Sequence, residues 1–292
     1  MKKRNVEIVV SPPPYHWVGD GFRVHNFIPG GYHLEMERMN PFILLDYNPK
    51  TLVPPSETPK GVGVHPHRGF ETVTIAYKGK VQHHDSNGGG GIIGEGDVQW
   101  MTAAGGILHK EYHEKEWSKK GGEFQMAQIW VNLPAKDKMS RPKYQTIENR
   151  QINKHRLENN DGEIEVIAGE YKQTKGAVST FTPINMFNAK LKKDVTMELS
   201  FPANYNSALL VVEGNITING KETVAVDQLA LMANDGENFT IITNENSIVL
   251  ILSGDPINEP MAAHGPFVMN TREQLIEAYN DFNKGKFGYL ED

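Results

Sequence analysis

Four side chains in the first half of the sequence have residue types and spacing suited to binding a metal ion. His65 and His67 lie two positions apart, and so do His109 and Glu111. Residues two apart on a β-strand point to the same face of the sheet, so each pair can face one cavity. Two such pairs on facing strands would present three imidazoles and one carboxylate to a single point.

The absence of cysteine limits which kinds of metal site the chain can form. The chain has 292 residues and no cysteine, which excludes thiolate zinc sites, iron–sulfur clusters, disulfides and cysteine nucleophiles. Any metal must therefore bind nitrogen and oxygen. Such a ligand set suits iron(II), manganese, nickel, copper or zinc, and the ligands alone do not choose among them. Nine of the 11 histidines lie at or before His113, so a histidine site is expected in the first half.

The other early histidines have weaker patterns. Adjacent residues on a strand face opposite ways, so at most one of His83 and His84 faces the cavity. We favour His83 as a cavity-lining residue over a plain surface turn. His113 lies in a polar stretch and is expected to be exposed. Three histidines without a paired pattern are expected to be exposed or satisfied locally: His16, His25 and His33.

The elements that must position these side chains are predicted to be strands. Short β-branched or aromatic runs alternate with Gly, Pro, Asn and Asp turns. The predicted strands are 72–77, 98–101 and 124–133 in the first half, and 196–201, 208–213, 215–218, 228–232, 239–242 and 247–252 in the second. This even spacing predicts two β-rich units, roughly 20–135 and 160–255, each a sandwich or barrel.

Two further segments differ from this pattern. Residues 141–160 are polar and poor in apolar side chains, so they are expected to connect the two units. The one strongly predicted helix lies near the end of the chain. Asn270 or Thr271 can cap it, Leu275 and Tyr279 have helical spacing, and Gly285 ends it.

Charge and hydropathy argue against several classes of partner and location. The chain has 30 Lys and Arg against 36 Asp and Glu, a net charge of −6, which argues against sequence-independent nucleic-acid binding. The apolar run Val6 to Val10 is too short for a signal peptide, and no run reaches the ~18 apolar residues of a membrane span. We therefore expect no direct nucleic-acid partner, no membrane and a cytoplasmic location, with the nucleus as an alternative in a eukaryote.

The chain resembles the pirin family of bicupins along most of its length. The matching segments are His65 to Val73, Gly96 to Ala103, Gly106 to Glu111, Trp130 to Leu133 and His264 to Thr271. The resemblance implies an all-β fold of two cupin barrels (double-stranded β-helices, or jelly rolls) in tandem, with a short C-terminal helix. The expected domains are a metal-binding N-terminal cupin (1–140), a connection (141–160) and a C-terminal cupin with the terminal helix (161–292).

The resemblance also implies the site. The family's metal ligands fall on His65, His67, His109 and Glu111. Glu71 occupies the position of a general cupin ligand, but in pirin-like proteins it should not bind the metal. The metal implied is one iron(II), with zinc, manganese, nickel, copper and cobalt as alternatives. Residues 160–255 contain no histidine, so the second cupin should hold no such site, and the later His264 is expected to be structural.

Two functions follow from the resemblance. The first is a quercetin 2,3-dioxygenase, in which a flavonol-like substrate reacts with O2 and releases carbon monoxide as the depside forms. There Glu111 would be catalytic, as the base that accepts the flavonol hydroxyl proton. The alternative is a non-catalytic, metal- or redox-sensing regulator that binds a transcription factor or metabolic enzyme. A metal-stabilised β protein without turnover is a third interpretation.

Overall fold

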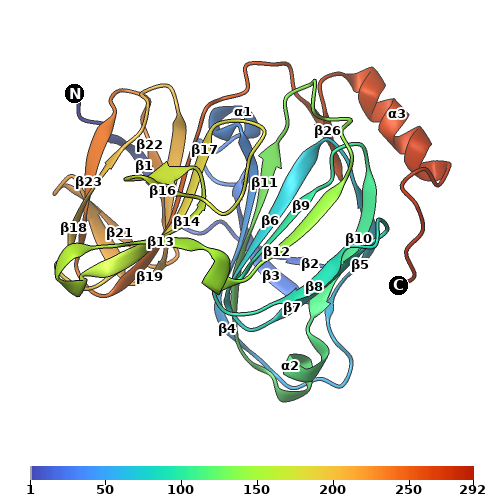
Figure 1. The fold of residues 1–292 in the computed structure, drawn as a ribbon, viewed down its shortest axis with the longest axis horizontal. Coiled ribbons are helices and arrows are strands. Elements are labelled where there is room, and N and C mark those ends of the chain that lie inside the picture. Colours follow the sequence, from blue (N-terminus) through green and yellow to red (C-terminus); the bar gives the residue numbers. More distant parts are fainter. Residues whose placement is uncertain (1) are drawn as a thin grey trace. The chain divides into compact units, whose positions relative to one another are not determined.

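Antiparallel strands form most of the computed structural model, which describes residues 2–292 and leaves Met1 outside the described part (Figure 1). Contacts divide the chain into two units. We call residues 14–29, 42–149 and 257–292 the first barrel. The described residues up to Pro13, together with 30–41 and 150–256, form the second barrel. Each barrel contains one seven-stranded and one four-stranded sheet.

Burial alternates along strands of the first barrel such as Val81–Asp85 and Ile107–His113, as expected of a sheet with one face toward a core. Its larger sheet has the order β12 (Lys143–Ile147), β9 (Val98–Thr102), β6 (Phe70–Lys78), β11 (Gly122–Asn132), β4 (Phe42–Val53), β3 (Phe22–Ile28) and β2 (Tyr15–Val18). Its smaller sheet has the order β5 (Gly61–His67), β10 (Ile107–His113), β7 (Val81–Asp85) and β8 (Gly90–Ile93). The remaining elements are α2 (Lys115–Lys120), β25 (Ala262–His264), β26 (Phe267–Met269) and α3 (Arg272–Asn283).

The second barrel repeats this plan with more apolar strands. Its larger sheet has the order β1 (Val6–Val10), β22 (Leu229–Met232), β19 (Asn206–Glu213), β24 (Ser247–Gly254), β17 (Ile184–Leu191), β14 (Gly162–Ala168) and β13 (Asn153–Arg156). Its smaller sheet has the order β18 (Thr196–Ser200), β23 (Asn238–Thr243), β20 (Asn215–Ile218) and β21 (Glu222–Ala225). Short elements complete it: α1 (Met36–Met39), the pair β15 (Glu170–Tyr171) and β16 (Thr174–Lys175), and the 3₁₀ turn Glu158–Asn160. A second 3₁₀ turn, Asn149–Gln151, lies where the chain passes from one unit to the other.

Each barrel has its own apolar core between its two sheets. In the first barrel, Phe22 and Phe124 from the larger sheet pack with Val81 and Ile93 from the smaller one. In the second barrel, residues of both sheets, such as Phe187 and Phe239, belong to one buried cluster. Burial of these side chains is the main source of stability for such sandwiches.

The predicted all-β fold of two cupin barrels is confirmed, and so are its predicted strands. By their contacts, the described residues up to Pro13 group with the second barrel and residues 257–292 with the first, while the domain ranges 1–140, 141–160 and 161–292 stay a prediction. The cause is strand pairing: β1 pairs with β22, with Val10 opposite Leu229. The predicted connection 141–160 also contains two strands, because β12 pairs with β9 and β13 with β14.

The terminal helix forms where the sequence predicts it. The Thr271 side chain accepts a hydrogen bond from the Gln274 backbone, and the Gln274 side chain accepts one from the Thr271 backbone, a capping box. The helix lies beside β26 (Figure 1), where Leu275 packs with Phe267. Among the described residues, no helix is both long enough and apolar enough to cross a membrane.

Candidate metal centre

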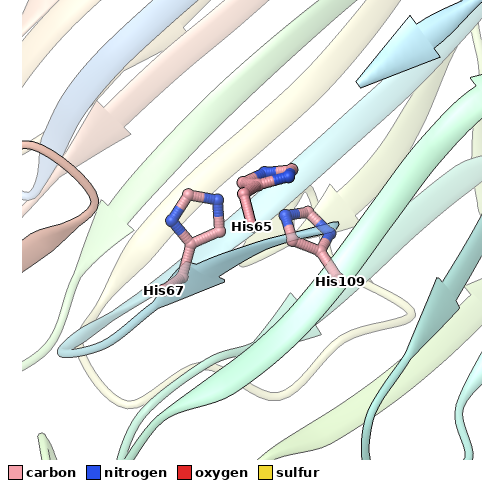
Figure 2. Close-up of side chains that lie close together, drawn as sticks. All are labelled: His65, His67 and His109. Carbon is pink, nitrogen blue, oxygen red and sulfur yellow. The ribbon is translucent and has the colours of Figure 1, made fainter. Parts of the chain in front are cut away.

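Strands β5 and β10 bring three of the four predicted ligands together. The strands are antiparallel, and His109 lies directly opposite His65. His67 is two residues further along β5 on the same face, so the three imidazoles converge (Figure 2). Their ring centroids are 4.2–4.8 Å apart, and their candidate ligand nitrogens all lie within 4.8 Å of one another.

A sharp turn after His67 fixes this end of β5. Gly69 has φ of +94°, a conformation that favours glycine, and a Cβ there would collide with the backbone carbonyl of Val268. The turn lets the chain pass from β5 of the smaller sheet to β6 of the larger one. It also lies against the segment that contains Pro266, whose carbonyl oxygen is 3.4 Å from His67 Nδ1.

Hydrogen bonds orient the imidazoles. The Nδ1 atoms of His65 and His67 face backbone carbonyl oxygens, those of Gly63 at 2.8 Å and Pro266 at 3.4 Å. When Nδ1–H donates to a carbonyl, Nε2 keeps its lone pair and is free to bind a metal. His109 Nε2 is buried and has no hydrogen-bond partner among the described residues. This orphaned nitrogen beside two other imidazoles fits a nitrogen ligand of a metal ion.

Burial keeps these rings neutral. It lowers the pKa of His67 and of His109 well below the ordinary value, and the neighbouring histidines lower each pKa further. Burial also lowers the pKa of His65, against the opposing effects of its Gly63 hydrogen bond and the Glu111 charge. Because a metal binds the deprotonated imidazole, the three rings are prepared for binding near neutral pH.

Glu111, the fourth predicted ligand, is brought into an overlapping group. It pairs with His83 of β7, and its carboxylate lies within 4.8 Å of ligand nitrogens of His83 and His109. The pairing of β10 with β5 shifts register between His109 and Glu111. His109 therefore belongs to both groups, the three histidines and the set of His83, His109 and Glu111.

The Glu111 carboxylate is held by two amides that the sequence reasoning did not identify. Gln99 Nε2 donates to Oε1 at 2.8 Å, and Gln128 Nε2 donates to Oε2 at 2.9 Å. A signal for Gln128 was present, because strand alternation puts it on the same face as Trp130. For Gln99, strand periodicity predicts which face of the sheet the side chain lies on, but it does not predict that the side chain binds Glu111.

His83 is a buried member of this network. Its side chain is fully buried, which contradicts the surface-turn alternative. Its Nε2 lies 3.4 Å from Asp85 Oδ2, its Nδ1 lies 3.1 Å from Gln99 Nε2, and Tyr144 stacks on its ring at 4.5 Å. His83 and Gln99 thus connect the histidines to the carboxylate of Glu111.

Three further residues considered in the sequence analysis lie outside these two groups. The expectation that His113 is exposed is wrong: it is 2% exposed, because β10 continues through it and places it on the same face as His109 and Glu111. Glu71 is buried and accepts a hydrogen bond from Thr102 at 2.7 Å, and burial raises its pKa. His264 is exposed and pairs with the Tyr279 hydroxyl at 2.8 Å, which joins β25 to α3.

Known proteins resemble this chain over nearly its whole length. The family model described as Pirin matches residues 21–131, and that described as Pirin C-terminal cupin domain matches residues 186–288. A Pseudomonas aeruginosa protein named "Putative quercetin 2,3-dioxygenase PA2418" is 44% identical over 272 residues, covering 93% of this chain and 94% of that protein.

Solved structures agree with these sequence matches. The crystal structure of a quercetin 2,3-dioxygenase from Acinetobacter baumannii has a TM-score of 0.93 and 43% identity, covering 99% of this chain and 100% of that chain. The bacterial pirin YhhW from Escherichia coli, in complex with nickel(II), shares the fold at 19% identity, with a TM-score of 0.64 over 86% of this chain and 100% of that chain. With both barrels matched and its relatives covered almost end to end, the chain belongs to the pirin family of two-cupin proteins.

Proposed function

We propose that the chain is a metal-dependent dioxygenase that cleaves quercetin-like flavonols with O2. The observation that carries the proposal is the convergence of His65, His67 and His109, with the Nε2 of His109 buried and unpartnered among the described residues. Relatives named as quercetin 2,3-dioxygenases support the choice of reaction.

The proposed metal ligands are His65, His67, His109 and Glu111, and the proposed metal is iron(II). Three neutral imidazoles and one carboxylate suit a divalent transition metal and leave two of six octahedral positions free for other groups. A metal bound there would act as a Lewis acid that lowers the pKa of a flavonol hydroxyl and orients the substrate.

Glu111 is the proposed base for the flavonol hydroxyl proton. Two amide donors, at 2.8 and 2.9 Å, fix the plane of its carboxylate, and Thr74 Oγ1 also donates to Oε1 at 3.4 Å, so Oε2 is the oxygen with a lone pair left for the proton. Gln99 also lies 3.1 Å from His83 Nδ1, which couples the position of the base to the histidine network. Both amides would hold the carboxylate before and after it accepts the proton.

Aromatic side chains beside His67 suit a flat aromatic substrate. Phe70 and Trp130 stack with ring centroids 4.1 Å apart, and the Trp130 ring lies 5.0 Å from His67 in an edge arrangement. Phe70 is fully buried and supports Trp130, which is partly exposed and would offer a flavonol ring an offset or edge contact.

Oxygen uptake tests the proposal. Purified chain is stripped with a chelator, reloaded with iron(II), checked for metal occupancy, and mixed with quercetin and related flavonols. We expect O2 consumption and carbon monoxide release, both lost in His109→Ala together with the metal. His84→Ala is the matched control, because His84 is an exposed histidine of β7. Full iron occupancy without O2 consumption on any flavonol would contradict the proposal and favour the non-catalytic regulator.

A further inference from the structure

Four consecutive glycines, residues 88–91, span the turn after β7 and the start of β8. The turn holds the carboxylate of Asp85, because the backbone N–H groups of Asn87 and Gly89 both donate to its Oδ1, at 2.9 and 2.8 Å. A Cβ on residue 89 would collide with Oδ2 of the same carboxylate, so glycine leaves the room that this contact needs. The turn therefore fixes Oδ1 as the acceptor of two backbone hydrogen bonds and leaves Oδ2 for another donor.

The Oδ2 atom of Asp85 faces His83. The two residues lie two apart on β7 and point to the same face, where their side chains are 1% and 0% exposed. His83 Nε2 lies 3.4 Å from Asp85 Oδ2. A carboxylate only accepts hydrogen bonds, so the Nε2 of His83 carries a hydrogen and donates it.

Gln99 fixes the other ring nitrogen of His83 independently. The Nε2 atom of Gln99 donates to Glu111 Oε1 at 2.8 Å, and this carboxylate determines which end of the amide is the NH2 group. The same NH2 group lies 3.1 Å from His83 Nδ1. A hydrogen on Nδ1 would place two donors against each other, so Nδ1 is the nitrogen with the lone pair. Both partners thus select the neutral His83 ring with its hydrogen on Nε2.

His83 in turn determines the tautomer of His109. The Nδ1 atoms of the two rings are 3.3 Å apart. Because the Nδ1 of His83 accepts, the Nδ1 of His109 carries a hydrogen and donates it, and two lone pairs would otherwise repel. The lone pair of His109 therefore lies on Nε2, the buried nitrogen without a partner among the described residues, beside His65 and His67.

We propose that Asp85, acting through His83, is a positioning residue that holds His109 in the tautomer that binds the metal. This role depends on His109 as a metal ligand, as proposed above, and does not depend on the flavonol reaction. The other two histidines differ, because the Nδ1 atoms of His65 and His67 face backbone carbonyl oxygens. The tautomer of His109 is set by side chains, so one substitution outside the ligand set can change it.

Asp85→Asn reverses the order of donors and acceptors. The new amide oxygen must still accept from the Asn87 and Gly89 backbones, so the NH2 group faces His83 Nε2. His83 then carries its hydrogen on Nδ1 and donates it to His109 Nδ1, which moves the hydrogen of His109 to Nε2. In Ser-His-Asp triads the same exchange leaves the geometry intact and selects the wrong histidine tautomer.

Long-range ¹H–¹⁵N correlation spectra of the metal-free full-length chain, labelled with ¹⁵N-histidine, measure this tautomer. His109→Ala assigns the signals of His109 by their loss. We expect the hydrogen of His109 on Nδ1 in the unmodified chain and on Nε2 in Asp85→Asn. Asp97→Asn is the matched control and should leave the tautomer unchanged. Asp97 also accepts two backbone hydrogen bonds, from Gly94 and Asn149 at 2.9 and 2.8 Å.

Titration with zinc(II) against a competing chelating dye measures the consequence for metal binding. We expect the affinity to be at least 10-fold weaker in Asp85→Asn and unchanged in Asp97→Asn. His83→Phe keeps an aromatic ring beside Tyr144, which stacks on His83 at 4.5 Å, and removes the acceptor. It should also weaken zinc(II) binding at least 10-fold, and it tests the role of this pair if Asp85→Asn does not fold.

The outcomes separate this role from the proposed reaction. The role of Asp85 is overturned if Nε2 of His109 carries the hydrogen in the unmodified chain, or if Asp85→Asn and His83→Phe both bind zinc(II) as tightly as the unmodified chain does. An unmodified chain that bound no zinc(II) would contradict the metal centre and this role together. Full iron(II) occupancy without O2 consumption would contradict the flavonol reaction alone, and the tautomer and zinc(II) affinities would still support the role of Asp85.

Discussion

The two barrels have the same strand plan but bury different side chains. In the first barrel, strand β10 buries His109, Glu111 and His113 on one face. In the second barrel, the corresponding core is one apolar cluster that includes Phe187 and Val211. Burying polar groups costs free energy unless they are hydrogen-bonded. The first barrel therefore has less apolar core than the second, because these polar side chains occupy part of its interior. The fold itself therefore does not determine chemistry, which depends on the residues placed inside it.

The largest effect is expected from removing a proposed ligand in the first barrel. His67→Ala should lower metal affinity at least 100-fold, because it removes one of three converging imidazoles. The measurement is metal content after dialysis against a defined iron(II) concentration. His155→Ala, a partly buried histidine of the second barrel, is the control and should retain full metal content. If His67→Ala kept its metal, the proposed difference between a metal-binding first barrel and an apolar second barrel would be wrong.

A substitution in the apolar core of the second barrel tests whether that barrel is stabilised separately from the first. Phe187 is fully buried and packs near Tyr171 and Phe201, so Phe187→Ala should destabilise this barrel by about 3–5 kcal/mol. Hydrogen exchange resolved by peptide locates the effect. We expect faster exchange in β14, β17 and β24, with β5 and β10 unchanged and metal content intact. Faster exchange in β5 and β10 would show that the barrels do not unfold separately.

Sequence periodicity predicts the strands of both barrels because apolar alternation is local. It also predicts the two same-face pairs, since a spacing of two along a strand needs no knowledge of the partner. It does not predict that β1 pairs with β22, because that pairing joins residues more than 200 positions apart. It places neither Gln99 nor Gln128 against Glu111 either, because these residues, 12 and 17 positions from Glu111, lie on strands of the other sheet and meet it only across the barrel interior.

His113 shows a different failure. The polar residues around it suggest exposure, but the strand continues past Glu111 and carries it into the barrel. There, burial lowers its pKa to about 4. Local composition misleads at this position because the neighbours on the other face of β10 are the solvated ones.

Removing the metal should distinguish the barrels without any mutation. A metal that binds the folded state alone stabilises it by about 2.7 kcal/mol when its free concentration is 100 times the dissociation constant. Chelation should therefore speed hydrogen exchange in β5, β7 and β10 and leave β17 and β24 of the second barrel unchanged. Readdition of iron(II) should restore protection. A uniform change across both barrels, or none, would contradict a metal centre confined to the first.

The last predicted effect concerns how each barrel accommodates a buried charge. In the second barrel, Glu165 is fully buried and pairs with Lys154 and Lys190 at 3.2 and 2.7 Å. In the first barrel, buried Lys138 instead donates to three uncharged oxygens, those of the Asn132 side chain and the Gly69 and Val268 backbones, at 2.6–2.9 Å. Burial lowers the pKa of Lys138 from 10.5 to about 7.

This difference predicts a pH dependence of stability for the first barrel. Because the folded pKa of Lys138 lies below the unfolded one, the unfolded state binds more protons between pH 7 and 10.5, and stability rises with pH across that window. Below about pH 7 the lysine is protonated in both states and contributes no slope. Urea unfolding of chelated protein should show a slope of up to about 1.4 kcal/mol per pH unit that Lys138→Met lacks. The exposed Lys136→Met should keep the slope. An identical slope in Lys138→Met would mean that the three oxygens hold the ammonium as effectively as carboxylates hold the lysines of the second barrel.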